Sequence, residues 1–236
     1  MNQELTKLES KQFEGKTLKY LAIEPDGYTA GTDYPMVVLL HGFGANMGDL
    51  AGLCPAIDPE GYVYICPNAP LSVQIGMGVT GYAWTPPGDN RTSGDIDEAE
   101  SLLAGLIEEV TDQYDVRPGN IILGGFSQGG MMTYRYGLPN PQLFAGIVAL
   151  SARVPDVDEV RKRLPEKRTQ PIFISHGHLD QMIPIEEGQG SREFLEAEGY
   201  SPEYREYAMG HEISQEVLSD VVPWIQKVLP PKIRGS

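Results

Sequence analysis

The sequence predicts an α/β fold in which a mostly parallel central sheet is covered by helices on both faces. Short runs of β-branched and other apolar residues alternate with longer amphipathic segments, which is typical of parallel strands joined by crossover helices. The central apolar runs are nearly continuous, as expected of strands buried on both faces. At 236 residues, 41% of them hydrophobic, the chain suits one domain over residues 1–236.

The individual elements follow from these patterns. Strands are expected over residues 17–23, 36–40, 62–66, 121–124, 145–150, 171–175 and 204–207. Helices are expected over residues 95–114, 131–136, 187–198 and 214–228; the first begins with acidic residues that suit the positive end of a helix dipole. Residues 1–15 are expected to be a short N-terminal extension, and residues 234–236 have the composition of a vector-derived tail.

Charge and composition exclude several classes of partner. With 18 Lys and Arg against 33 Asp and Glu, the net charge is −15, which disfavours nucleic acid and anionic lipid surfaces. No apolar run approaches the about 18 residues of a membrane span, and no signal-peptide pattern opens the chain. We therefore expect a cytoplasmic protein without integral membrane contact. Cys54 and Cys66 lie in apolar stretches, which favours buried free thiols.

The sharpest local motif is the run Gly125-Phe126-Ser127-Gln128-Gly129. It lies between an apolar strand and a helix, where a Gly-x-Ser-x-Gly turn lifts a serine above the sheet edge. The two glycines let the strand and the helix approach each other closely. We therefore predict that Ser127 is a nucleophile rather than an idle turn residue.

A serine hydroxyl needs a base, and the base needs an orienting carboxylate. His211 is the one histidine that follows both Ser127 and a carboxylate in a strand-end loop, and that carboxylate is Asp180. The order Ser…Asp…His and the helix plus strand expected between the last two residues predict that their loops lie side by side. Ser127, Asp180 and His211 are thus the predicted catalytic triad.

The other three histidines have structural interpretations. His41 is expected to hold the loop at residues 42–44, and His176 and His178 lack the further ligands that a metal site needs. No cofactor or metal is predicted. The oxyanion donors are predicted to be the backbone N–H of Gln128, which follows the nucleophile, and that of Phe43 in the glycine-rich loop after residues 36–40.

The surroundings of the site are expected to be open. Only residues 151–170 separate two consecutive strands at the place where related folds insert large caps, which leaves room for one short helix. Residues 76–91 form a long Gly- and Pro-rich loop, a length that favours a functional role. Trp84, Met77 and Met182 are candidates for an apolar substrate-binding lining, although ordinary core packing is an equal alternative.

Several segments together resemble the phospholipase/carboxylesterase group of α/β-hydrolases, which includes the acyl-protein thioesterases. They lie at residues 39–44, 67–70, 125–130, 150–151, 176–184 and 210–211, in the order of that family. The resemblance implies an α/β-hydrolase fold without a large cap and a serine esterase with Ser127, Asp180 and His211 as its triad. It implies Phe43 and Gln128 as oxyanion donors.

Two departures from the family pattern bear on the substrate. Ala45 and Asn46 stand where thioesterases have an Asp, and Thr85 follows Trp84 where they have an aromatic residue. These changes favour a carboxylesterase for small-molecule esters with short to medium acyl chains. An acyl-protein thioesterase, a lysophospholipase and a non-catalytic binding module are the alternatives, and the oligomeric state, a homodimer included, stays open.

Overall fold

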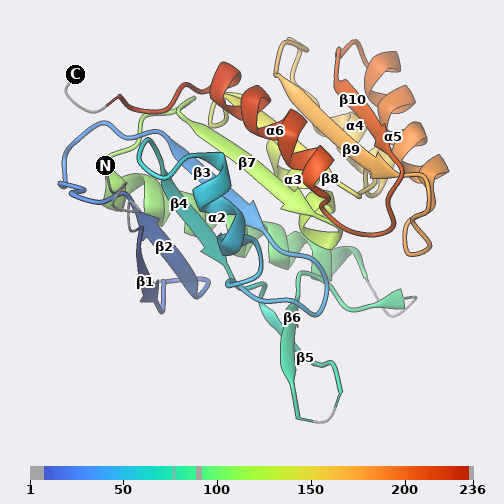
Figure 1. The fold of residues 1–236 in the computed structure, drawn as a ribbon. Helices are drawn as coiled ribbons and strands as arrows, with labels where there is room; N and C mark the ends of the chain where they lie inside the picture. Colours follow the sequence, from blue (N-terminus) through green and yellow to red (C-terminus); the bar gives the residue numbers. More distant parts are fainter. Residues whose placement is uncertain (1–7, 77, 89–91, 234–236) are drawn as a thin grey trace.

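A computed structural model describes residues 8–76, 78–88 and 92–233. Within these residues eight strands form one sheet in the order β1-β2-β4-β3-β7-β8-β9-β10. Their bounds are β1 Glu9–Phe13, β2 Tyr20–Glu24, β3 Met36–Leu40, β4 Val63–Pro67, β7 Ile121–Phe126, β8 Gly146–Leu150, β9 Ile172–Gly177 and β10 Glu203–Tyr207. Six of these strands run parallel: β4, β3, β7, β8, β9 and β10. At one edge of the sheet, β2 pairs antiparallel with β4, and β1 pairs antiparallel with β2 (Figure 1). The predicted mostly parallel sheet is confirmed.

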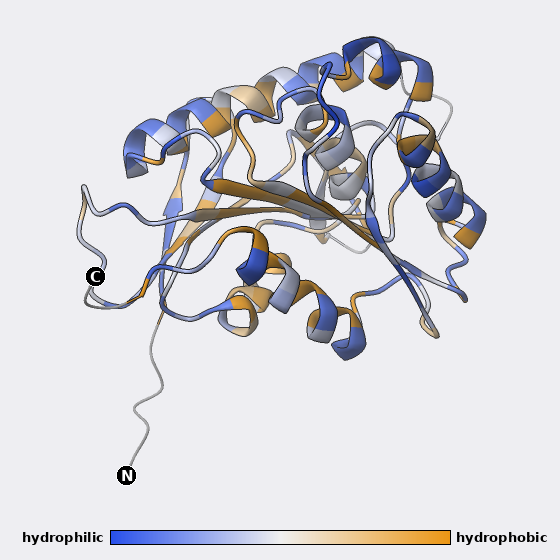
Figure 2. Cartoon of the chain, turned by 90° about the horizontal axis from the view of Figure 1, so that it is seen from above, coloured by the Kyte–Doolittle hydropathy of each residue, from blue (hydrophilic) through white to orange (hydrophobic). Residues whose placement is uncertain are grey.

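Helices cover both faces of this sheet. Their bounds are η1 Leu50–Leu53, α1 Cys54–Ile57, α2 Ser93–Tyr114, α3 Gln128–Gly137, α4 Val157–Arg163, α5 Ile185–Ala197 and α6 Gln215–Val228. Figure 2 shows the apolar strands between two layers of helices. The helices α2 to α5 pack on one face, and η1, α1 and α6 pack on the other.

The sequence of β3 shows why two separate cores form. All five of its residues are buried, and successive side chains of a strand point to opposite faces. Val38 and Leu40 belong to the core under α2 and α3, whereas Val37 and Leu39 belong to the core under α6. An unbroken apolar run is therefore what a strand covered on both sides requires.

Three expectations about the chain's organisation need correction. The N-terminal extension contains β1, whose polar, exposed residues carry no apolar alternation, and the strand expected over residues 17–23 begins only at Tyr20. The loop expected over residues 76–91 contains the strand β6 (Thr80–Ala83), which forms a hairpin with β5 (Leu71–Gln74). The short η1–α1 segment after β3 was not predicted.

The expectations about the cap and the cysteines hold. Between β8 and β9 lies only α4, of seven residues, so the described chain has no large cap. Cys54 and Cys66 are free and buried, and burial raises the pKa of the Cys54 thiol. None of the helices in the described residues is both long enough and apolar enough to cross a lipid bilayer.

Candidate active site

Ser127 lies on a strained turn between β7 and α3. Its backbone has φ 55° and ψ −119°, a conformation that non-glycine residues rarely adopt. The neighbouring glycines are required by contact: a Cβ on Gly125 would lie 2.4 Å from the Gly129 carbonyl carbon, and one on Gly129 would lie 2.1 Å from the Leu40 oxygen. The Ser127 N–H donates to the Leu150 carbonyl at 2.9 Å, so the turn is fixed to the adjacent strand.

Three polar side chains from separate loops form one hydrogen-bonded chain at this turn. His211 Nε2 lies 2.9 Å from Ser127 Oγ, and His211 Nδ1 lies 2.7 Å from Asp180 Oδ2. A carboxylate can only accept, so the imidazole carries its proton on Nδ1 and leaves Nε2 free to accept the Ser127 proton. The structure thus brings together Ser127, Asp180 and His211, as the chain order predicted.

Asp180 is also held in place through Oδ1, the carboxylate oxygen that does not contact His211. Oδ1 accepts the Met182 and Ile183 N–H groups, each at 2.9 Å, in a side chain with no solvent exposure. Burial raises the pKa of this carboxyl, but the Ile183 N–H, His211 and the Met182 N–H outweigh that effect, so the pKa lies below its ordinary value. The group is therefore ionised at neutral pH and able to orient His211.

The amides of Phe43 and Gln128 fit the predicted role of oxyanion donors. Gln128 is the first residue of α3, and N–H groups in the first turn of a helix have no acceptor within the helix. Among the described residues, neither amide has a hydrogen-bond acceptor. Gly42 lies directly against the turn at Ser127, because a Cβ on Gly42 would be 3.3 Å from the Ser127 Cβ. The loop that carries Phe43 therefore borders Ser127.

His41 holds this loop through both of its ring nitrogens. Nε2 accepts the Ala69 N–H at 3.0 Å, which leaves the proton on Nδ1, 2.7 Å from the Gly42 carbonyl. Burial lowers the pKa of His41 and so maintains this neutral form. His41 therefore fixes loop geometry, as its position in the sequence suggested.

The substrate-lining prediction for Trp84 is wrong. Its side chain is fully buried, and its indole N–H donates to the His41 carbonyl at 3.0 Å. A buried indole needs an acceptor, and this one connects the end of β6 to the loop of Phe43. Trp84 therefore stabilises the loop that carries Phe43 from the protein interior.

The Gln128 side chain has a role that the sequence did not reveal. Its Oε1 accepts the Trp84 N–H at 2.7 Å, and its Nε2 donates to the Thr85 carbonyl and hydroxyl, each at 2.9 Å. These hydrogen bonds of Gln128 connect the end of the β5–β6 hairpin to the turn at Ser127. These partners are far apart in the sequence, so spacing alone gives no signal for them.

The two methionines predicted to line the site have different outcomes. Met182 is 75% exposed, beside Asp180, and it is not among the residues that line the cavity next to His211. Its contact with substrate stays a prediction. Met77 lies outside the described residues.

His176 and His178 do not form a metal site with their neighbours. His176 is buried, and its Nε2 donates to the Ile183 carbonyl at 2.8 Å, so it secures the loop that holds Asp180. His178 is exposed, 3.5 Å from Glu206. The described residues contain no group of three or more His, Cys, Asp or Glu side chains suited to a metal ion.

A cavity of about 240 Å³ lies next to His211. Besides His211, its wall contains Asp49, which precedes the unpredicted η1 segment, and Leu50 and Leu53 from η1 itself. Phe126 at the end of β7 and Glu212 and Ile213 after His211 complete it. The apolar spacing of Leu50, Leu53 and Ile57 was the signal in the sequence for the helical part of this wall.

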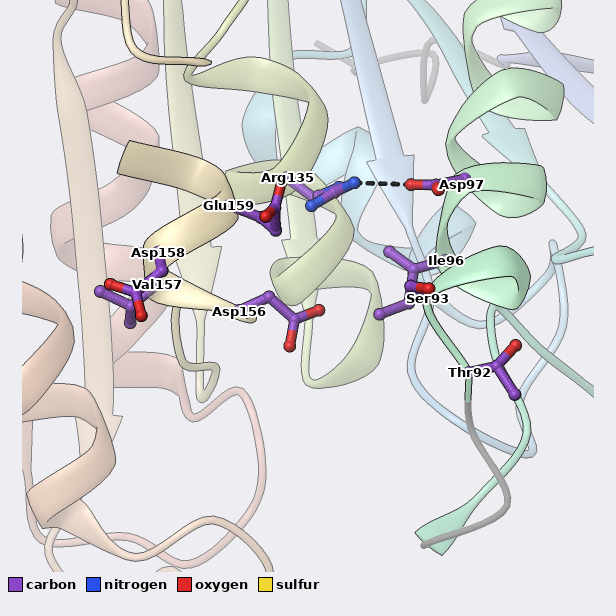
Figure 3. A pocket seen from close by; sticks show the side chains of 9 residues that line it. All are labelled: Thr92, Ser93, Ile96, Asp97, Arg135, Asp156, Val157, Asp158 and Glu159. Carbon is purple, nitrogen blue, oxygen red and sulfur yellow. Dashed lines mark hydrogen bonds and ion pairs between the residues drawn. The ribbon is translucent and has the colours of Figure 1, made fainter. Parts of the chain in front are cut away.

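A larger hollow of about 650 Å³ lies elsewhere, between the beginnings of α2 and α4 (Figure 3). Arg135 lines it, but the guanidinium is already paired with Asp97 at 2.7 Å and Glu100 at 2.8 Å. Ser127, Asp180 and His211 are all absent from its lining, so the larger volume does not coincide with the candidate active site.

The sheet, the strained serine turn and the strand-end loops define an α/β-hydrolase. The family described as Phospholipase/Carboxylesterase matches residues 29–229, and the chain belongs to that family.

Individual relatives agree with this assignment. The chain is 31% identical to acyl-protein thioesterase 1 of Gibberella zeae, over 70% of this chain and 75% of that protein. It is 33% identical to a probable carboxylesterase of Oryza sativa subsp. japonica, over 69% of this chain and 64% of that protein. The crystal structure of esterase PE8 aligns with a TM-score of 0.74 at 25% identity, over 94% of this chain and all of that one.

Proposed function

We propose that this hydrolase is a serine carboxylesterase that cleaves short- to medium-chain carboxylic esters through an acyl-enzyme. The observation that carries the proposal is the hydrogen-bonded chain from Asp180 through His211 to Ser127 on a strained turn. Its relatives include proteins named as carboxylesterases and acyl-protein thioesterases, and both kinds of name describe acyl transfer to water.

In the first half of the reaction, Ser127 Oγ attacks the ester carbonyl carbon while His211 Nε2 takes its proton. Asp180 stabilises the imidazolium that forms. The oxyanion accepts hydrogen bonds from the Phe43 and Gln128 N–H groups. The intermediate collapses when the bond to the alcohol oxygen breaks and that oxygen takes the proton from His211 Nε2.

In the second half, water replaces the alcohol. His211 Nε2 takes a proton from the water, whose oxygen attacks the acyl carbon of the Ser127 ester. The bond to Ser127 Oγ then breaks, and Oγ takes the proton from His211 Nε2, which releases the carboxylic acid and restores the hydroxyl. No cofactor is needed to balance either half.

The open surroundings support short to medium acyl chains. The single short helix α4 fills the connection where related folds carry a large cap, and the cavity next to His211 is modest in volume. The thioesterase and lysophospholipase alternatives use the same three residues and differ only in the ester presented to them.

The test is fluorophosphonate labelling, read by peptide mass, of the wild type, Ser127→Ala and Ser219→Ala. We expect stoichiometric labelling of Ser127, loss of labelling in Ser127→Ala, and full labelling in Ser219→Ala, where an exposed serine on α6 is removed. A labelled residue other than Ser127, or no labelling at all, contradicts the proposal and favours a non-catalytic binding module.

Substrate class is tested with p-nitrophenyl esters of increasing chain length beside a thioester and a lysophospholipid. We expect kcat/KM to peak at short to medium acyl chains and to exceed the values for the other two classes. A maximum at sixteen or more carbons, or faster thioester turnover, replaces the carboxylesterase assignment with one of the alternatives.

A further inference from the structure

The cavity beside His211 is apolar inside and acidic at its rim. Four apolar side chains line it: Leu50, Leu53, Phe126 and Ile213. The Phe126 ring contacts the His211 ring, with 4.8 Å between their centroids. Asp49 and Glu212, which also line the cavity, are exposed to solvent.

The position of His211 indicates which part of an ester this cavity receives. This step rests on the proposed function, in which His211 Nε2 gives its proton to the leaving alcohol oxygen. That oxygen must lie within hydrogen-bond reach of Nε2, so the group attached to it extends along the wall that His211 forms. The cavity in that wall is therefore on the alcohol side of the scissile bond.

The permanent charges on the side chains that line this cavity are all negative. No Lys or Arg is among its lining residues. Within the part of the chain that the structure describes, neither Asp49 nor Glu212 forms an ion pair or a side-chain hydrogen bond. Two unpaired carboxylates attract a cation and repel an anion entering between them.

The aromatic lining adds a second feature that suits a cation. Quaternary ammonium groups bind where aromatic rings and carboxylates occur together, because they carry positive charge on an apolar, weakly hydrated surface. Phe126 supplies the ring, Leu50 and Leu53 supply apolar contact, and the rim supplies the negative charge. An anionic group finds no hydrogen-bond donor among the side chains of Asp49, Leu50, Leu53, Phe126, Glu212 and Ile213.

We propose that the cavity lined by Asp49, Phe126 and Glu212 is a leaving-group subsite that selects esters of cationic alcohols, quaternary ammonium alcohols above all, over those of anionic alcohols. The acyl group then extends away from this wall. The bond broken is the ordinary ester bond, and the products are the carboxylic acid and the cationic alcohol.

Three acetate esters matched in size test the charge preference. They carry choline, its neutral isostere 3,3-dimethylbutanol, and the anionic alcohol isethionate. We expect kcat/KM to be highest for the choline ester, about three- to tenfold above the neutral ester, with the isethionate ester lowest; the effect is modest because the carboxylates are exposed. High salt should reduce the spread.

Variants separate the local charge from the overall charge of the protein. In Asp49→Asn/Glu212→Gln, the ratio of choline to neutral ester should fall toward one. The control Asp112→Asn/Glu166→Gln removes two exposed carboxylates that precede β7 and β9, at the opposite edge of the sheet. It changes the net charge equally and should keep both the ratio and the activity of the wild type.

Each outcome decides the matter. A choline ester cleaved no faster than its neutral isostere, an unchanged ratio in the rim variant, or an equal loss of preference in the control overturns the subsite while leaving the esterase intact. Absence of hydrolysis of all three esters together with an unlabelled Ser127 contradicts the proposed function itself. Absence of hydrolysis with Ser127 labelled overturns the subsite, because a small choline ester should then be a substrate.

Discussion

The turn at Ser127 and the β5–β6 hairpin both border the loop of Phe43, but they are held in different ways. The turn continues a buried central strand, and Gly125 and Gly129 leave no space for a Cβ. The hairpin strands pair only with each other, and Figure 1 shows them projecting from the sheet. Ile75 and Val79 on the hairpin are 48% and 56% exposed.

This difference separates the chemistry from its surroundings. Close contacts of Gly125 and Gly129 hold Ser127 in position, so few sequences can form that turn. The hairpin is anchored at one end, where the Gly44 N–H donates to Tyr82 and the Gln128 side chain contacts Trp84. At the exposed end, Ile75 lies beside Gly44, and we expect substitutions there to leave Ser127, Asp180 and His211 in place.

The largest effect on activity is expected from the three hydrogen-bonded residues Ser127, His211 and Asp180. His211→Ala should lower kcat by about 10⁶-fold, because no other described histidine reaches Ser127. His178→Ala removes an exposed histidine that makes no hydrogen bond to Ser127, Asp180 or His211 and should leave kcat unchanged. Steady-state kinetics on a short aryl ester measures both, and near-normal kcat in His211→Ala would refute the assigned base.

The next effect concerns the close contacts of the turn. Gly129→Ala should lower the free energy of unfolding by about 3 kcal/mol or more, because its Cβ would collide with the carbonyls of Leu40 and His41. Gly190→Ala, at a helical glycine with open space around it, should instead be stabilising by about 0.5–1 kcal/mol. Urea unfolding compares them; equal stabilities would mean that the turn is not tightly packed.

A smaller effect follows from Asp180. Its pKa is lower in the folded chain than the about 3.9 of an unfolded one, so the stability it contributes is present above that value and is lost as the pH falls through the folded pKa. Between about pH 6 and about pH 3, the wild type should lose more unfolding free energy than Asp180→Asn, which cannot titrate. Equal losses in the two proteins would contradict the assigned hydrogen bonds.

The smallest effect is expected at the hairpin. Ile75→Ser/Val79→Ser replaces exposed side chains and should change the free energy of unfolding by less than about 0.5 kcal/mol. Ile122→Ala in the buried strand β7 should cost about 2–5 kcal/mol. A large loss of stability in the hairpin variant would show that its exposed end contributes to the core.

Sequence patterns predicted the parts of the molecule where local rules and the fold agree. The parallel strands appear as continuous apolar runs, and the order of Ser127, Asp180 and His211 pointed to three strand-end loops that the structure brings together. By contrast, β1 is an exposed edge strand of mostly polar residues, so nothing in its pattern marks it. Long-range pairing with β2 determines it instead.

The error at Trp84 has a similar cause. A tryptophan in a Gly- and Pro-rich stretch suggested an exposed apolar lining, but two contacts distant in sequence, His41 and Gln128, hold it in the interior. The cavity beside His211 depends on η1 packing near the loop of His211. Such juxtapositions follow from tertiary packing, which no local pattern records.

A crystal structure of the protein after reaction with a fluorophosphonate tests the proposed site most directly. We expect a phosphorus–oxygen bond to Ser127 Oγ, the phosphoryl oxygen within about 3 Å of the Phe43 and Gln128 N–H groups, and His211 still joined to Asp180. An adduct on another residue, or a phosphoryl oxygen turned away from both amides, would contradict this account of the site.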